Sequence, residues 1–187
     1  MSLRELKKEK TRKAISDMAT QLFMERGYHE VTTAEIALKA EVSVPTLFKY
    51  FPTKESLVFD EDLETEAKLI RSVTDRKAGK TVLDSLLDFG LSNVDALQDN
   101  EKLHFADMMK LIDDTPELSV YARLMWTRYE KSLAATIRKE TGNKVGTLEA
   151  DAIARFALDS YHRALAAPQP KASLKRLFKL LQDGWQE

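Results

Sequence analysis

Residues 32–54 hold the feature that most constrains the fold, two short helical segments separated by a turn of a few residues. Thr32 followed three residues later by Glu35 is a capping-box pattern, which predicts that a helix begins there. Ser43 is a typical N-cap and Pro45 is tolerated in a first helical turn, so a second helix is predicted directly after Ser43. Two short helices joined by a three- or four-residue turn predict a helix-turn-helix.

A series of short motifs runs through roughly the first third of the chain in order and without gaps, and they are Gly27-Tyr28, Thr32-Thr33, Glu35-Ile36-Ala37, Val42-Ser43, Pro45-Thr46-Leu47-Phe48, Tyr50-Phe51 and Lys54-Glu55. On these residues the stretch resembles the DNA-binding segment of the TetR family of bacterial transcriptional regulators. An ordinary buried helix pair is the alternative, but Thr46, Lys49 and Tyr50 are poor core residues.

The rest of the chain reads as helix, with no strand, internal repeat or low-complexity segment. We therefore predict an all-α fold with a three-helix helix-turn-helix DNA-binding domain at 1–53 and a six-helix ligand-binding and dimerisation body at 54–187. This layout also resembles the family. The predicted helices span about 4–26, 33–40, 44–51, 54–75 and 81–93, one capped by Asn100, then about 115–140, 148–167 and a last one reaching Trp185.

Charge is distributed unevenly along a chain whose net charge is only −1. Residues 1–13 contain six basic and two acidic side chains, which gives a basic arm beside the helix-turn-helix, as phosphate binding requires. The chain has no cysteine, which excludes disulfides and thiolate metal sites and suits a reducing compartment. With no signal-peptide core and no apolar run long enough for a membrane span, we expect a cytoplasmic protein.

The second helix of a helix-turn-helix lies in the major groove, so the segment after Ser43 is predicted to read DNA. Leu47 and Phe51 should face inward and carry no sequence information. The segment has no Arg, Asn or Gln, so we expect specificity to rest on thymine methyl groups, Lys49 and DNA shape. The resemblance implies DNA contacts by Thr33, Val44, Pro45, Thr46, Phe48, Lys49, Tyr50 and Lys54.

Two residues depart from the family pattern. Glu41 stands in the turn where a glycine is common, and a left-handed backbone there would cost it about 1 kcal/mol. Ala34 is too short to reach a base, so the first of the two short helices is expected to contribute backbone contacts only. Neither departure changes the prediction of a DNA-binding segment.

The body contains two sets of mostly apolar residues, and each set allows two structural interpretations. The first set is either ordinary core or the wall of a pocket for an unknown small-molecule effector, and it comprises Phe89, His104, Phe105, Met108, Met109, Tyr121, Met125, Trp126 and Tyr129. The second set either closes the core of a monomer or forms a homodimer interface, and it comprises Phe156, Tyr161, Leu174, Leu177, Phe178, Leu181 and Trp185.

No catalytic or metal-binding constellation is visible, since the three histidines are scattered and no glycine-rich phosphate loop or nucleophile elbow occurs. We therefore predict no enzyme, no cofactor and no metal. The function predicted is a ligand-responsive repressor that binds palindromic double-stranded DNA as a dimer. The alternative is a ligand-binding or protein-interaction module that retains the DNA-binding segment without small-molecule control. A helical-bundle enzyme is a third hypothesis, which the lack of a catalytic constellation disfavours.

Overall fold

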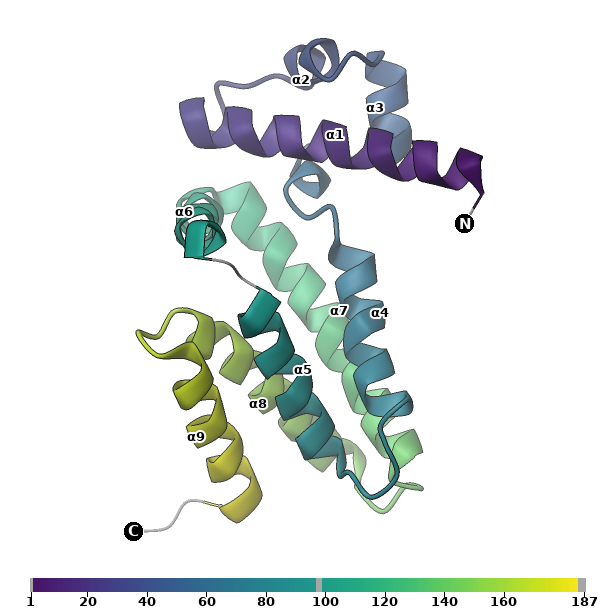
Figure 1. Ribbon diagram of the computed structural model, residues 1–187, viewed down its shortest axis with the longest axis vertical. Helices are drawn as coiled ribbons and strands as arrows, with labels where there is room; N and C mark the ends of the chain where they lie inside the picture. Colours follow the sequence, from purple (N-terminus) through teal and green to yellow (C-terminus); the bar gives the residue numbers. More distant parts are fainter. Residues whose placement is uncertain (1, 97–98, 185–187) are drawn as a thin grey trace. The chain divides into compact units, whose positions relative to one another are not determined.

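The computed structural model describes residues 2–96 and 99–184, with side chains described for 2–96 and 106–184. Within these residues the chain is all-helical and has no strand, which confirms the predicted fold class (Figure 1). None of the helices in this part of the chain is both long enough and apolar enough to cross a membrane. The helices are α1 (Leu3–Arg26), α2 (Thr33–Lys39), α3 (Val44–Tyr50), α4 (Asp62–Thr74), α5 (Val82–Ala96), α6 (Asp99–Asp114), α7 (Pro116–Glu140), α8 (Thr147–Leu165) and α9 (Pro170–Asp183).

Most helices begin and end where local sequence signals predict. The Ser43 hydroxyl accepts a hydrogen bond from the Thr46 amide at 3.2 Å and so starts α3, while Pro116 opens α7. Gly27 ends α1 with a φ of 87°, a value that glycine adopts without steric cost. These boundaries depend on neighbours within a few residues, which is why they can be predicted from sequence.

The predicted helix beginning at Lys54 is wrong. A single 3-10 turn occupies Glu55–Leu57 instead, and α4 begins only at Asp62. Helix α1 provides the physical reason, because its side chains bind the carbonyl groups that a continuous helix would use. The Ser16 hydroxyl donates to the Leu57 carbonyl at 2.9 Å, and the Arg12 guanidinium donates to the Asp60 carbonyl.

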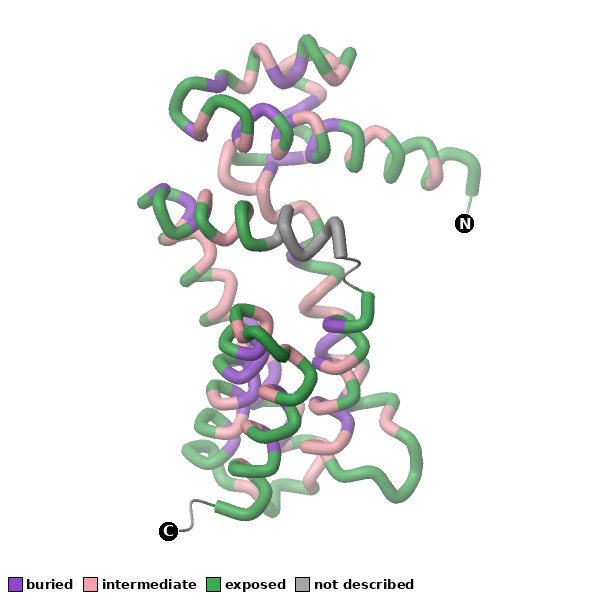
Figure 2. Tube along the Cα trace, turned by 60° about the vertical axis from the view of Figure 1, so that its left-hand side comes forward, coloured by how far each residue is buried: buried purple, intermediate pink, exposed green. Residues whose placement is uncertain are grey.

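The chain divides into two compact units. The first comprises residues 1–63 and 104–122, and the second comprises residues 64–103 and 123–187. The first unit thus contains the whole predicted DNA-binding segment, together with most of α6 and the start of α7. Figure 2 shows buried positions in both α1–α3 and the helices of the second unit.

The core of the first unit forms beneath the helix-turn-helix. Ile15 and Leu22 of α1 are 0% and 1% exposed, and they pack in one cluster with Ile36 of α2, Leu47 of α3 and Leu57. Burying one such side chain contributes about 1.5–3 kcal/mol, so this cluster fixes α2 and α3 on α1. The cluster also includes Ile112 and Leu118, which join α6 and α7 to the same core.

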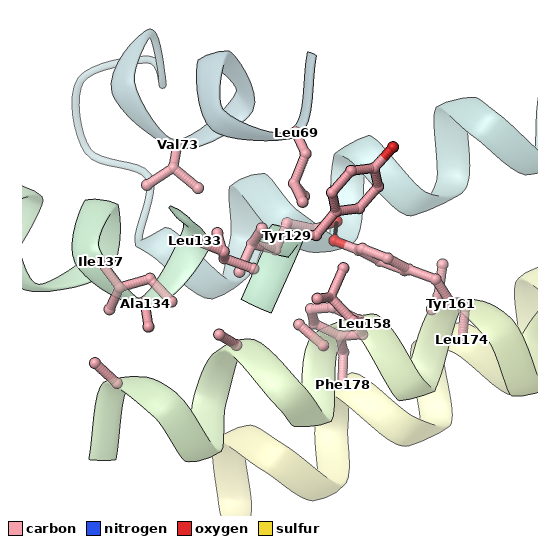
Figure 3. Packing of buried hydrophobic residues seen from close by; sticks show 14 of the residues in the cluster. Leu69, Val73, Tyr129, Leu133, Ala134, Ile137, Leu158, Tyr161, Leu174 and Phe178 are labelled. Atoms are coloured by element: carbon pink, nitrogen blue, oxygen red, sulfur yellow. Dashed lines mark hydrogen bonds between the residues drawn. The ribbon is translucent and has the colours of Figure 1, made fainter. Parts of the chain in front are cut away.

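The core of the second unit is formed by α4, α5, α7, α8 and α9 (Figure 3). The Tyr161 hydroxyl donates to the Leu86 carbonyl at 2.7 Å, so this buried polar group is satisfied. Gly90 of α5 lies against the same ring, where an added Cβ would stand 2.6 Å from the Tyr161 Cε1 atom. Helix α5 can approach α8 and α9 closely at Gly90 because this residue has no side chain.

This core corrects part of the predicted dimer interface. Leu174 and Phe178 are 0% exposed within their own chain, and Tyr161 is buried beside them with its ring stacked on that of Phe178. These three residues therefore close the core of the chain, and of the three only Tyr161 keeps any exposed surface, 8%. Phe156, Leu177 and Leu181 remain partly exposed, and Trp185 lies outside the described residues.

Candidate DNA interface

Helix α3 is held by its buried face and presents the opposite face to solvent. Leu47 is 0% and Phe51 is 1% exposed, and both belong to the core of the first unit. Pro45, Phe48 and Lys49 are exposed, whereas Val44 and Thr46 are half-buried. The side chains predicted to read DNA thus separate from the two predicted to anchor the helix, as a major-groove helix requires.

The first two turns of α3 are further ordered by their cap. The Ser43 and Thr46 side-chain oxygens lie 2.8 Å apart and share a hydrogen bond, in addition to the Thr46 amide bond to Ser43. The Thr46 hydroxyl is therefore oriented before any DNA is bound. Such preorganisation lowers the entropic cost of making a base or phosphate contact.

Helix α2 begins at the predicted cap, with only half of the predicted capping box. The Glu35 amide donates to the Thr32 hydroxyl at 3.1 Å. The Glu35 carboxylate, in contrast, accepts from the Arg26 guanidinium at the end of α1 and lies 4.0 Å from the Lys39 ammonium. The carboxylate therefore links α2 to α1 and does not return to its own N-cap. Thr33, in the first turn of α2, is half-buried.

Lys54 occupies a different environment from the one predicted for a phosphate contact. Its ammonium donates to the Tyr28 carbonyl at 2.6 Å and lies 4.2 Å from the centre of the Tyr28 ring. Burial lowers the pKa of Lys54, although Glu55 and Glu117 act in the opposite direction. Only the 3-10 turn Glu55–Leu57 follows Lys54, so the predicted N-terminus of a long α-helix, which would bind a phosphate, is absent there. Tyr50 is half-buried and packs against the core of the first unit.

The predicted basic arm is the first half of α1. Arg4, Lys7, Lys8 and Lys10 are exposed along it. Arg12 holds the Asp60 carbonyl, whereas Lys13 is 69% exposed and pairs with Asp17, one helical turn later, at 3.0 Å. Phosphate attraction by this arm therefore depends on its five exposed basic side chains, of which Lys13 already has an acidic neighbour.

Sequence reasoning missed the part that Arg12 and Ser16 play in placing the helix-turn-helix. Both lie on α1 among polar residues and carry no motif, while their partners stand more than 40 positions later in the chain. The sequence offered one hint of a break in the helix here: residues 58–62 lack a continuous apolar stripe at helical spacing.

The predicted effector-pocket residues divide between the two units. Met108, Met109 and Tyr121 belong to the first unit, where the Tyr121 ring stacks on Phe59 with 5.0 Å between centroids. The side chains of His104 and Phe105 lie outside the described residues. The second unit contains the remaining four, which pack in or against its core, and they are Phe89, Met125, Trp126 and Tyr129.

A helix-turn-helix with an anchored reading helix, followed by a larger helical body, defines a class of helical DNA-binding proteins. Residues 15–60 match the family model described as "Bacterial regulatory proteins, tetR family". This matched segment contains the second half of α1, the helix-turn-helix and the turn at Glu55–Leu57. This segment of the chain is thus similar to the bacterial regulatory proteins of the tetR family.

Similarity to individual relatives extends beyond that segment. The "Putative mycofactocin biosynthesis transcriptional regulator MftR" of Mycobacterium tuberculosis (strain ATCC 25618 / H37Rv) is 26% identical over 130 residues, which cover 70% of this chain and 65% of that protein. The "HTH-type transcriptional regulator TcmR" of Streptomyces glaucescens is 29% identical over 122 residues, covering 62% and 54%. The matched regions thus span less than two thirds of either relative.

A solved structure shares the fold along nearly the whole chain. FadR of Thermus thermophilus, described as a TetR family transcriptional repressor in complex with lauroyl-CoA, superposes with a TM-score of 0.61 at 24% identity. The superposition covers 94% of this chain and 95% of FadR. It establishes the fold of both parts of the chain, including the body, in which the sequence contains no specific motif.

Proposed function

We propose that this chain is a ligand-responsive transcriptional repressor that binds palindromic operator DNA as a homodimer in the bacterial cytoplasm. The observation that carries the DNA-binding part is the orientation of α3. Leu47 and Phe51 are buried and anchor it, while Pro45, Phe48 and Lys49 remain exposed for the major groove. The family match over residues 15–60 supports the same assignment.

Each candidate contact has a distinct task in this proposal. Lys49, for which the sequence permits a base or a phosphate contact, is assigned to a phosphate in this proposal. Together with the basic first half of α1 it fixes the position of the protein on the duplex without reading bases. Val44, Pro45 and Phe48 present apolar groups to thymine methyls, and Thr46 adds an oriented hydroxyl. Because Lys54 is bound to Tyr28, it supports the helix-turn-helix from within.

The proposed homodimer rests on geometry and on the outer surfaces of α8 and α9. A single reading helix contacts few base pairs, and a two-fold dimer doubles those contacts on a palindrome. Phe156 of α8 and Leu177 and Leu181 of α9 keep partial exposure after the core has formed. These three side chains are the proposed apolar centre of the interface.

The proposed effector response draws on the relatives and on the body. FadR is described as a repressor in complex with lauroyl-CoA, which supports a small-molecule effector for this chain. The aromatic and methionine residues Phe89, Met125, Trp126 and Tyr129 gather in the second unit and offer the surface type that lines such pockets. The alternative is a ligand-binding or protein-interaction module whose DNA binding responds to no small molecule, and it predicts the same helix-turn-helix.

Selection of bound fragments from a randomised duplex pool tests the proposal. We expect an enriched palindrome whose binding weakens steeply as salt increases. Retention without enrichment would contradict sequence-specific reading, and no retention at low salt would contradict DNA binding. In a second selection, Val44→Ala should change the enriched motif more than the total affinity, because a thymine methyl contact is lost.

The variant Lys49→Ala tests whether Lys49 contacts a phosphate, and because Lys49 is exposed it should leave the fold intact. It should weaken binding to all duplexes similarly and reduce the slope of log affinity against log salt by about 1. Lys131→Ala is the matched control, since Lys131 is an exposed lysine of α7 in the second unit. Equal slopes for the two variants would show that Lys49 makes no phosphate contact.

A further inference from the structure

A groove in the first unit takes no part in the proposed reading of DNA. It lies between α1 and α6 beside the segment that precedes α4, and its volume is about 1110 Å³. Small-molecule sites commonly enclose about 300–1,000 Å³, so the groove is large enough for a ligand with several rings. It lies outside the second unit, where Phe89, Met125, Trp126 and Tyr129 gather.

The floor of this groove is apolar and partly sulfur-containing. Phe23 of α1 is 1% exposed, so its ring is fixed by the core of the first unit, while Met24, Met108 and Leu111 keep partial exposure. Methionine side chains adapt to irregular ligand shapes and make favourable contacts with aromatic rings. A flat or branched apolar body would therefore gain contacts on both α1 and α6.

The rim of the groove carries five carboxylates and one ammonium group, that of Lys110. Two of the carboxylates have neighbours within α1, because Asp17 pairs with Lys13 at 3.0 Å and Glu25 accepts from the Gln21 amide at 2.8 Å. Asp107 and Asp114 of α6 are exposed on the opposite side. The acidic residues of the rim are Asp17, Glu25, Asp60, Asp107 and Asp114.

This combination selects the charge of a ligand as well as its shape. An acidic rim around an apolar floor attracts a cation and repels carboxylates and phosphates. We propose that the groove binds an organic monocation with an apolar body, such as an aromatic quaternary ammonium or phosphonium ion. An acyl-CoA, which carries several negative charges, is the kind of ligand that this rim rejects.

A ligand in the groove would contact α1, the helix against which both helices of the helix-turn-helix pack. Ile15, Leu22 and Phe23 of α1 pack with Ile36 of α2 and Leu47 of α3 in one core, so α1 positions both short helices. We therefore expect cation binding and DNA binding to alter each other by the same factor. This second part rests on the proposed function, whereas binding of the cation does not.

The methionine methyl groups of the full chain can report where the ligand binds. Among its six methionines, Met24 and Met108 line the groove, while Met125 packs against the core of the second unit. With methyl-labelled methionine, tetraphenylphosphonium should shift the Met24 and Met108 signals through its rings and leave Met125 unchanged. Tetraphenylborate has the same shape and the opposite charge, and we expect no binding in the groove.

Matched variants test the part played by the rim. Asp107→Asn together with Asp114→Asn should weaken tetraphenylphosphonium binding about fivefold, as expected for the loss of two exposed charges. Asp113→Asn is the control, because Asp113 is an exposed carboxylate of the same helix that does not line the groove. Calorimetry in 0.05 M and 0.5 M salt should show weaker binding of the cation at the higher salt.

Four results would overturn the inference: no binding of tetraphenylphosphonium, equal binding of both ions, a shift at Met125 in place of Met24 and Met108, or equal affinities of the double variant and its control. Duplex binding measured with and without the cation then separates this inference from the proposed function. DNA binding without cation binding refutes the groove alone. Cation binding without DNA binding at any salt refutes the proposed function and leaves the groove.

Discussion

Glu41 is a residue whose backbone conformation conflicts with its side chain. Its φ is +56°, and it follows α2 at the position that helices usually give to glycine. The Val42 amide donates to the Ala37 carbonyl at 2.9 Å, and the Glu41 amide donates to the Leu38 carbonyl at 3.2 Å. This is the hydrogen-bond pattern of a Schellman motif, which requires the left-handed residue. The strain is therefore accepted because the turn of the helix-turn-helix depends on it.

Glu41→Gly should stabilise the protein by about 1 kcal/mol, because glycine removes the Cβ that opposes a left-handed backbone. Urea unfolding followed by helical circular dichroism measures this change. Glu41→Ala is the control, since it removes the charge and keeps the Cβ, and it should give no comparable gain. A similar gain from both variants would assign the effect to charge.

Lys54 and Lys49 illustrate opposite roles for two lysines five positions apart. Lys54→Met should destabilise the protein by about 1–2 kcal/mol, because the half-buried Tyr28 carbonyl loses its ammonium donor and Tyr28 loses the cation over its ring. Lys49→Ala should change stability by no more than about 0.5 kcal/mol, since Lys49 is exposed. Thermal unfolding of both variants checks this, and equal stabilities would contradict the supporting role of Lys54.

At the scale of elements, α4 and α7 are joined by a carboxylate that lies largely inside the second unit. The Glu66 carboxylate accepts from the Arg128 guanidinium at 2.7 Å and from the Ser132 hydroxyl at 2.6 Å, and its side chain is 15% exposed. Burial raises the pKa of Glu66, but these two hydrogen bonds outweigh it and hold the pKa below its ordinary value of 4.5. Glu66 therefore stabilises the α4–α7 pair in its ionised form.

The sign of the resulting pH dependence follows from the lowered pKa. The contribution of Glu66 is present above pH 4.5 and is lost as the pH falls through the lower folded-state pKa. Glu66→Gln should cost about 1 kcal/mol at neutral pH and make the loss of stability below pH 4.5 shallower. Glu64→Gln, which alters an exposed carboxylate of the same helix paired with Arg71, is the control. Parallel pH profiles for the two variants would contradict the assignment.

At the scale of the whole molecule, the described residues form two units, each with a hydrophobic core of its own. Helices α6 and α7 contribute to the first unit, and most of α7 belongs to the second. The single helix α7 therefore contains residues of both cores, with Leu118 in one and Leu133 in the other.

The proposed homodimer predicts that apparent stability depends on protein concentration, because association stabilises only the folded chains. The Tm should rise with concentration, and Leu177→Asp should abolish this rise by placing a charge at the proposed interface. Leu124→Asp is the control, since Leu124 of α7 is 66% exposed and lies outside α8 and α9. Light scattering gives the mass of each variant, and a monomeric parent chain would contradict the dimer.

The sequence by itself determined the all-α class, the helix-turn-helix and most helix boundaries. Caps such as Ser43 and helix-ending residues such as Gly27 act on backbone groups within a few residues, so their effect can be predicted from the neighbouring sequence. The family resemblance rests on the same local segment. The apolar stripes of α8 and α9 were also visible, but not which residues in them face the interior of the chain.

Tertiary structure alone decided the features that depend on distant partners. The helix predicted at Lys54 does not form because Ser16 and Arg12, far earlier in the chain, bind the carbonyls of Leu57 and Asp60. Leu174 and Phe178 belong to the interior because α5 and α8 close over them. The acidic groove exists only where α1 and α6 meet. In each case the stabilising free energy comes from contacts between segments that lie far apart in the sequence, so no local sequence pattern predicts them.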